Sequence, residues 1–131
     1  MNRRRVIIAD CSQNLLEGIR GLLRTVFDSV VMVADLDSLL DAASRMEADL
    51  VVLDLSLGTG RCGEAVKAVK KAYPGMKVLV MSLHDEPGAV QEAVSAGADG
   101  FVLKRSAAAD LLPAVEKILS GKTFFSVNQD N

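Results

Sequence analysis

The chain has 131 residues, of which 50% are hydrophobic and 24% are charged, and its formal net charge is −2. This length predicts one domain, and a chain of this hydrophobicity can bury a sizeable core. Apart from the run Arg3, Arg4 and Arg5, the basic residues are scattered, which argues against a nucleic-acid-binding domain because such domains need a clustered basic face.

The cysteines and apolar segments predict a cytoplasmic protein. Two cysteines, Cys11 and Cys62, do not make a disulfide framework. The charged N-terminus lacks the apolar stretch of a signal peptide, and no window approaches the ~18 apolar residues of a membrane helix. We therefore expect a soluble domain that does not contact a membrane.

Short apolar runs alternate with segments of helical spacing along the whole chain. The expected strands are the runs 5–10, 30–35, 49–55, 77–82 and 100–104. Between them, apolar residues recur at steps of three and four, which predicts helices with one buried face. The helix ends are marked by Pro87 in a first turn, Ser106 as an N-cap, and Gly97 and Gly121 as C-terminal caps.

Five strands alternating with five helices predict an α/β fold with a doubly wound five-stranded parallel sheet and helices on both faces. Right-handed crossovers leave few topologies, and we expect the flavodoxin-like order 2-1-3-4-5. The domain is expected to span residues 1–126, with 127–131 as a polar tail or linker stub.

Polar residues stand where the expected strands end: Asp10, Asp54, Ser82 and Lys104. In an open α/β sheet, ligands bind outside the carboxyl ends of the strands, so these side chains are expected to converge on one crevice. The set favours phosphoryl transfer to a carboxylate. Asp54 could attack phosphorus, while Lys104 and Ser82 supply a charge and a hydrogen bond. Asp10 together with Asp54 could hold Mg²⁺, which prefers oxygen ligands.

Four motifs carry a resemblance to a known family: "IIAD", "VVLDLSL", "VLVMSLHDE" and "SAGADGFVLKRS". In this order and spacing, they resemble the receiver domain of two-component response regulators, from Arg5 to about Ser126. The phrases "NLLEGIRGLL" and "AVEKILSGKTFFS" are most similar to receivers that precede a helix-turn-helix output domain.

The resemblance assigns four signalling roles by position. Asp54 matches the phospho-acceptor, and Lys104 matches the lysine that pairs with a phosphoryl oxygen. Ser82 matches the switch hydroxyl, and Phe101 matches the aromatic whose rotamer follows that switch. The alternative for Phe101 is an ordinary core aromatic, since an aromatic within a strand usually packs inside.

The resemblance also implies a Mg²⁺ site, and here the sequence departs from the family. Asp10 and Asp54 match metal-site carboxylates, and Ser56 matches the position whose carbonyl ligates the metal. Cys11 stands where a second acidic residue normally ligates Mg²⁺, and a thiol there removes one hard oxygen and one charge. The loop after Asp54 also departs from the family, with Gly58 in place of the usual proline.

The resemblance implies a non-enzymatic receiver that accepts a phosphoryl group from a histidine kinase or phosphotransfer protein. It would control transcription through a DNA-binding output domain that this chain lacks, and it allows a homodimer. The alternative is a phosphorylation-independent pseudo-receiver, a protein-interaction module whose metal site Cys11 has disabled. A flavodoxin is disfavoured because "DCSQNLL" contains no glycine for a phosphate loop.

Overall fold

The computed structural model describes residues 4–9, 16–54, 62–82 and 87–125, with only the backbone described at residues 16, 17, 54, 62 and 87–89. Its strands are β1 (Arg5–Ala9), β2 (Ser29–Val33), β3 (Leu50–Asp54), β4 (Lys77–Ser82), β5 (Gly100–Leu103) and β6 (Phe124–Phe125). Its helices are α1 (Leu16–Arg24), α2 (Leu36–Arg45), α3 (Cys62–Ala72), α4 (Pro87–Ala96), the 3₁₀ turn η1 (Lys104–Ser106) and α5 (Ala107–Leu119).

The described strands form one parallel sheet in the order β2-β1-β3-β4-β5-β6. The predicted doubly wound α/β fold and the order of its first five strands are confirmed, and the sheet has one strand more than expected. The additional strand, β6, pairs Phe124 with Gly100 and Phe125 with Phe101. Two residues are too few to show the alternation by which a strand is recognised in sequence.

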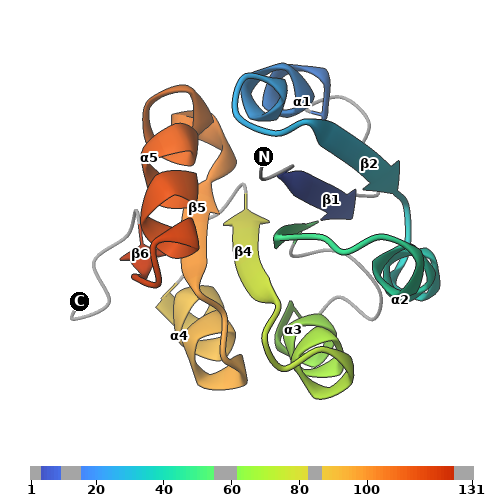
Figure 1. The fold of residues 1–131 in the computed structure, drawn as a ribbon. Coiled ribbons are helices and arrows are strands. Elements are labelled where there is room, and N and C mark those ends of the chain that lie inside the picture. The colour runs from blue at the N-terminus through green and yellow to red at the C-terminus, as the bar shows by residue number, and fades with distance from the viewer. Residues whose placement is uncertain (1–3, 10–15, 55–61, 83–86, 126–131) are drawn as a thin grey trace.

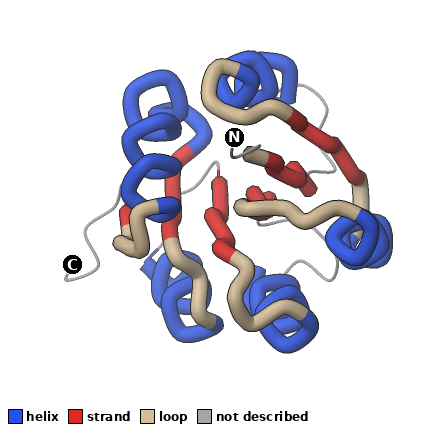
Figure 2. Tube along the Cα trace, viewed as in Figure 1, coloured by secondary structure: helices blue, strands red, loops and turns tan. Residues whose placement is uncertain are grey.

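Helices cover both faces of the sheet (Figures 1 and 2). α1 and α5 lie on one face, where Leu23 and Leu111 pack against strand residues such as Ile8. α2, α3 and α4 lie on the other face, where Leu39 and Val66 join a second buried cluster. Burial on both sides explains why the strands are nearly continuous aliphatic runs. No helix in the described ranges is long and apolar enough to cross a membrane.

The helix ends follow the sequence signals in part. Gly97 and Gly121 have φ values of 103° and 91°, a conformation that suits glycine at the C-terminal end of a helix. Ser106 stands at the N-cap of α5 but makes no side-chain capping bond. At a different helix, α2, the N-cap residue Asp35 does make a capping bond. Its Oδ1 accepts a 2.7 Å hydrogen bond from the Ser38 backbone N–H, which lowers the pKa of Asp35.

Three aspartates hold the amino edge of the sheet. Asp28, Asp49 and Asp99 each immediately precede a strand. Their Oδ2 atoms accept hydrogen bonds from the backbone N–H groups of Arg4 (2.8 Å), Arg5 (2.8 Å) and Val78 (2.9 Å), at the start of the neighbouring strand. Each aspartate also donates its own N–H to the carbonyl of that same residue, at 2.8 Å. Backbone groups at this edge are thus satisfied without a ligand.

Asp99 extends this arrangement to two further elements. Its carboxylate forms a 2.8 Å ion pair with Lys70 Nζ of α3, and that ammonium also donates to the Met76 carbonyl at 2.8 Å. The Asp99 carbonyl accepts a hydrogen bond from the Phe124 N–H of β6. Both charged side chains are mostly buried, with exposed fractions of 23% and 17%. Through these hydrogen bonds, Asp99 joins α3 to β4 and β6 at the start of β5.

Gly100 is confined by its neighbours. A Cβ atom there would lie 2.6 Å from Ile118 Cδ1 and 2.9 Å from both Leu79 Cδ1 and the Phe124 carbonyl oxygen. We expect Gly100→Ala to lower the free energy of unfolding by about 1–3 kcal/mol, the usual cost of overpacking. Urea unfolding measures this change.

The matched control is Gly18→Ala in α1, where no atom beyond the chain neighbours and the backbone of the helix itself lies within 4 Å of the added Cβ. It should raise the free energy of unfolding by about 0.5–1 kcal/mol through helix propensity. Equal effects of the two alanines would contradict the confinement of Gly100.

Candidate functional site

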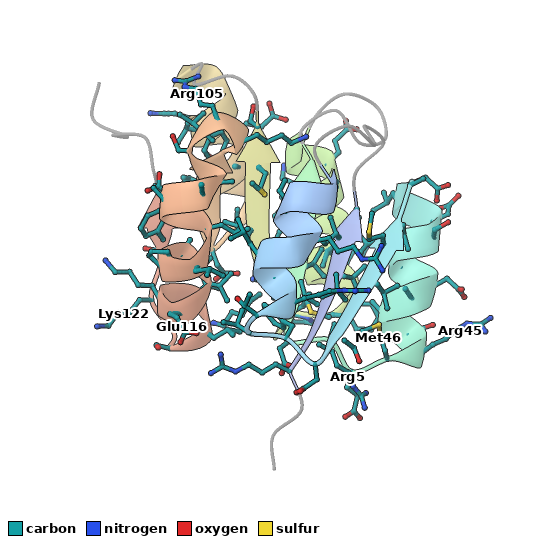
Figure 3. All side chains as sticks on the ribbon, turned by 90° about the horizontal axis from the view of Figure 1, so that it is seen from above. Arg5, Arg45, Met46, Arg105, Glu116 and Lys122 are labelled. Carbon is teal, nitrogen blue, oxygen red and sulfur yellow. The ribbon has the colours of Figure 1, made fainter. Side chains whose placement is uncertain are left out.

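Three of the predicted site residues lie next to one another at the carboxyl edge of the sheet. Asp54 closes β3 and pairs with Met81, the residue before Ser82. Ser82 closes β4 and pairs with Leu103, the residue before Lys104. Neighbouring strands are about 4.8 Å apart, so the backbones of these three residues span roughly 10 Å. Figure 3 shows this end of the molecule, where Arg105 lies, opposite the end that carries Arg5 and Glu116.

Ser82 and Lys104 are the buried polar and charged residues of the described chain. Their exposed fractions are 1% and 7%. A lysine is almost never buried so deeply without negative or carbonyl oxygen partners, because removing an ammonium from water is costly. A hydroxyl and an ammonium held at this edge form a suitable environment for an anion, whereas Arg105, the next residue, is exposed.

Phe101 lies in the core between two strands. It is fully buried, and its register partners are Val80 of β4 and Phe125 of β6. Side chains alternate between the faces of a strand, so Ser82, two residues after Val80, shares the face of Phe101. The structure thus brings the predicted switch hydroxyl and aromatic onto one face, and the half-buried Phe125 packs against the same cluster. The rotamer role of Phe101 stays a prediction.

Other predicted site residues lie outside the described part of the chain. These are Asp10, Cys11 and Ser56. The last described residue of β1, Ala9, pairs with Leu53, so β1 and β3 end side by side.

Asp54 and Cys62 are described by their backbone alone. The described residues contain no group of three or more His, Cys, Asp or Glu residues arranged to hold a metal ion. The donor chemistry of the predicted set still suits Mg²⁺, because two carboxylates and a carbonyl are hard oxygen ligands.

An open groove of about 510 Å³ lies elsewhere, between β2 and α2. Its lining residues are Val31, Val33, Asp37, Ser38, Asp41, Ala42, Arg45 and Met46. It is separated from Asp54 by β1, because β2 is the outermost strand on that side. Asp41 in its wall is paired with Arg45 at 3.2 Å, and the groove contains none of the predicted site residues.

One contact near the site was not predicted from the sequence. The Gly63 N–H in the first turn of α3 donates a 3.1 Å hydrogen bond to Glu92 Oε1 of α4. No local pattern signals such a contact, because the two residues are 29 positions apart and meet only through helix packing.

Comparisons with known proteins identify the family of the chain. Residues 6–116 match the family "Response regulator receiver domain". The chain is 28% identical over 129 residues to the transcriptional regulatory protein RcsB of Escherichia coli, covering 95% of this chain and 60% of that protein. It is 27% identical over 125 residues to the transcriptional regulatory protein DegU of Brevibacillus brevis, covering 94% of this chain and 53% of that one. The chain thus spans less than two thirds of these relatives.

Solved structures give the same result. A LuxR-family two-component response regulator from Aurantimonas superposes with a TM-score of 0.87 and 27% identity, covering 98% of this chain and 94% of that one. The isolated REC domain of RcsB from Salmonella enterica, with the phosphomimetic BeF3-, superposes with a TM-score of 0.85 and 25% identity, covering 98% and 97%. Since the family match covers most of the residues, the chain belongs to the response regulator receiver domain family.

Proposed function

We propose that this receiver accepts a phosphoryl group on Asp54 from a histidine kinase or phosphotransfer protein and thereby changes its interaction surface. The observation that carries the proposal is the alignment of Asp54, Ser82 and Lys104 at the carboxyl ends of three neighbouring strands. A carboxylate nucleophile beside a buried hydroxyl and a buried ammonium has the parts that phosphoryl transfer requires.

The proposed reaction is transfer of a phosphoryl group to the Asp54 carboxylate. A carboxylate oxygen of Asp54 attacks phosphorus, the bond from phosphorus to the donor breaks, and an acyl phosphate forms on the aspartate. The transferred group spreads its negative charge over three oxygens, so positioned cations and donors supply most of the stabilisation. Lys104 would neutralise one of these oxygens, and the Ser82 hydroxyl would donate a hydrogen bond to another.

Mg²⁺ would be held by Asp10, Asp54 and the Ser56 carbonyl. The bound metal would supply further positive charge to the phosphoryl oxygens. Cys11 contributes neither a hard oxygen nor, as a thiol, a charge, so we expect a weaker Mg²⁺ site than two adjacent carboxylates would give.

The output is proposed to be transcriptional. Both curated relatives are named transcriptional regulatory proteins, and a similar solved structure is an RcsB–DNA complex, with a TM-score of 0.85 and 27% identity over 94% of this chain. We assign DNA binding to a separate domain, because the basic residues of this chain are scattered. A homodimer would be compatible with such an output.

The second candidate is a pseudo-receiver that acts without phosphorylation. It is favoured by Cys11, which stands in the place of a metal-ligating acid. In that case the fold would serve as a protein-interaction module, and Asp54 would remain unmodified.

Phosphorylation is tested with acetyl phosphate and intact-mass spectrometry. We expect Mg²⁺-dependent addition of one phosphoryl group to the native chain and none to Asp54→Asn, because the amide is not a nucleophile. Chelation of Mg²⁺ should prevent the addition. An unmodified native chain at saturating Mg²⁺ would favour the pseudo-receiver, and modification of Asp54→Asn would refute the assigned acceptor.

Lys104 and Arg105 provide a matched pair of neighbouring cations. Lys104→Ala should slow the acetyl phosphate reaction by about 10²-fold, the lower end of losses for a group that stabilises transition-state charge. Arg105→Ala removes the same charge from an exposed position and should change the rate by less than about twofold, because exposed charges are screened. Similar losses in both variants would mean that net charge, not a positioned ammonium, controls the rate.

Replacement of Cys11 tests the metal site directly. Cys11→Asp should lower the Mg²⁺ concentration at half-maximal reaction rate on the order of tenfold, equivalent to about 1.4 kcal/mol, because it adds a charged oxygen ligand. Cys11→Ser, which adds no charge, is the control and should shift it much less. An unchanged Mg²⁺ requirement in Cys11→Asp would show that position 11 does not contact the metal.

A further inference from the structure

Glu92 makes a contact between two helices that begin near the proposed site. The Gly63 N–H of α3 donates to Glu92 Oε1 of α4 at 3.1 Å. The first N–H groups of a helix have no partner within the helix, and a carboxylate there is also favoured by the helix dipole. Glu92 therefore caps α3 from a neighbouring helix.

The contact depends on the absence of a side chain at position 63. A Cβ atom on Gly63 would lie 2.8 Å from Glu92 Cγ and 3.0 Å from Glu92 Oε1. The first distance is too short for a non-bonded contact and the second is tight, so an alanine would displace the Glu92 side chain. Gly63 is buried, so its N–H is shielded from water and needs a partner within the protein. The described partner is Glu92.

The two helices joined by this contact each begin shortly after a residue of the proposed phosphorylation site. α3 begins at Cys62, after the segment that follows Asp54, and α4 begins at Pro87, after the segment that follows Ser82. Figure 1 shows the two helices side by side on one face of the sheet. The contact thus fixes the start of α3 relative to α4, and with it the point where the segment leaving Asp54 must end.

The other end of α3 is attached separately. Lys70, in its last turn, pairs with Asp99 just before β5, at the amino edge of the sheet. The helix is therefore anchored at both ends, by Glu92 near the carboxyl edge and by Asp99 near the amino edge. A variant that releases one end leaves the other intact.

We propose that Glu92 is a positioning residue for phosphoryl acceptance: by capping α3 at Gly63, it fixes the start of the first helix after Asp54, and the Mg²⁺ dependence of phosphoryl acceptance depends on that position. This inference rests on the proposed function. Glu92 does not itself contact the reacting atoms; it acts through the start of α3.

The test compares four variants in two assays. The first measures how the rate of Asp54 modification by acetyl phosphate depends on Mg²⁺ concentration. The second measures amide hydrogen exchange in the first turn of α3 without Mg²⁺. Glu92→Ala should raise the Mg²⁺ concentration at half-maximal rate on the order of tenfold, the lower end of effects for groups that orient metal ligands. It should also speed exchange at Ala65 and Val66. Glu92→Gln retains an oxygen acceptor and should stay close to the native values.

Gly63→Ala separates positioning from stability. Alanine is the better helix former, so general helix stability should rise, yet the displaced carboxylate should raise the Mg²⁺ requirement as Glu92→Ala does. The control, Lys70→Met, breaks the Asp99 pair at the far end of α3. It should lower the free energy of unfolding and leave the Mg²⁺ requirement unchanged.

The outcomes distinguish this inference from the proposed function. A native chain that is not modified at Asp54 defeats the proposed function, and the inference with it. If the native chain reacts but Glu92→Ala and Gly63→Ala keep its Mg²⁺ requirement, only the inference fails. An equal shift in Lys70→Met would also overturn it, because general loosening of α3 would then explain the effect.

Discussion

The parallel register of the central strands is the constraint on which the rest of the molecule depends. Because β1, β3, β4 and β5 all run in one direction, their carboxyl ends meet at one edge. Asp54, Ser82 and Lys104 are far apart in the chain and become neighbours only through the pairs Asp54–Met81 and Ser82–Leu103. A slip of one residue would turn every side chain of a strand to the opposite face, and the aliphatic cores on both faces oppose it.

The two edges of the sheet use aspartates differently. At the amino edge, the carboxylates of Asp28, Asp49 and Asp99 accept hydrogen bonds from backbone N–H groups of the neighbouring strand. Those carboxylates serve the structure, since they satisfy groups that would otherwise need water. Asp54, in contrast, is the last residue of β3, and Asp10 comes directly after β1 in the sequence. Position relative to a strand therefore separates structural from candidate functional carboxylates of the same residue type.

Fold and chemistry can vary independently in this domain. The proposed replacement of an acid by Cys11 would concern a metal ligand, while the buried residues that build the sheet are those of an ordinary aliphatic core. The same fold supports a phosphorylated switch or a binding module, and the ligand set decides between them. β6 adds a further constraint, because Phe125 packs beside Phe101 and couples the burial of that ring to the segment after α5.

Several features could be predicted from the sequence because they depend on local order. Aliphatic runs separated by helical stripes predicted five strands and their order, and the positive φ of Gly97 and Gly121 followed from their places after helices. The strand ends likewise predicted Ser82 and Lys104 at one edge, and both are buried there. Tertiary packing alone decided β6, the Lys70–Asp99 pair and the Glu92 cap on Gly63. Each of these depends on the distance between segments remote in sequence, and that distance exists only once both faces of the sheet are covered by helices.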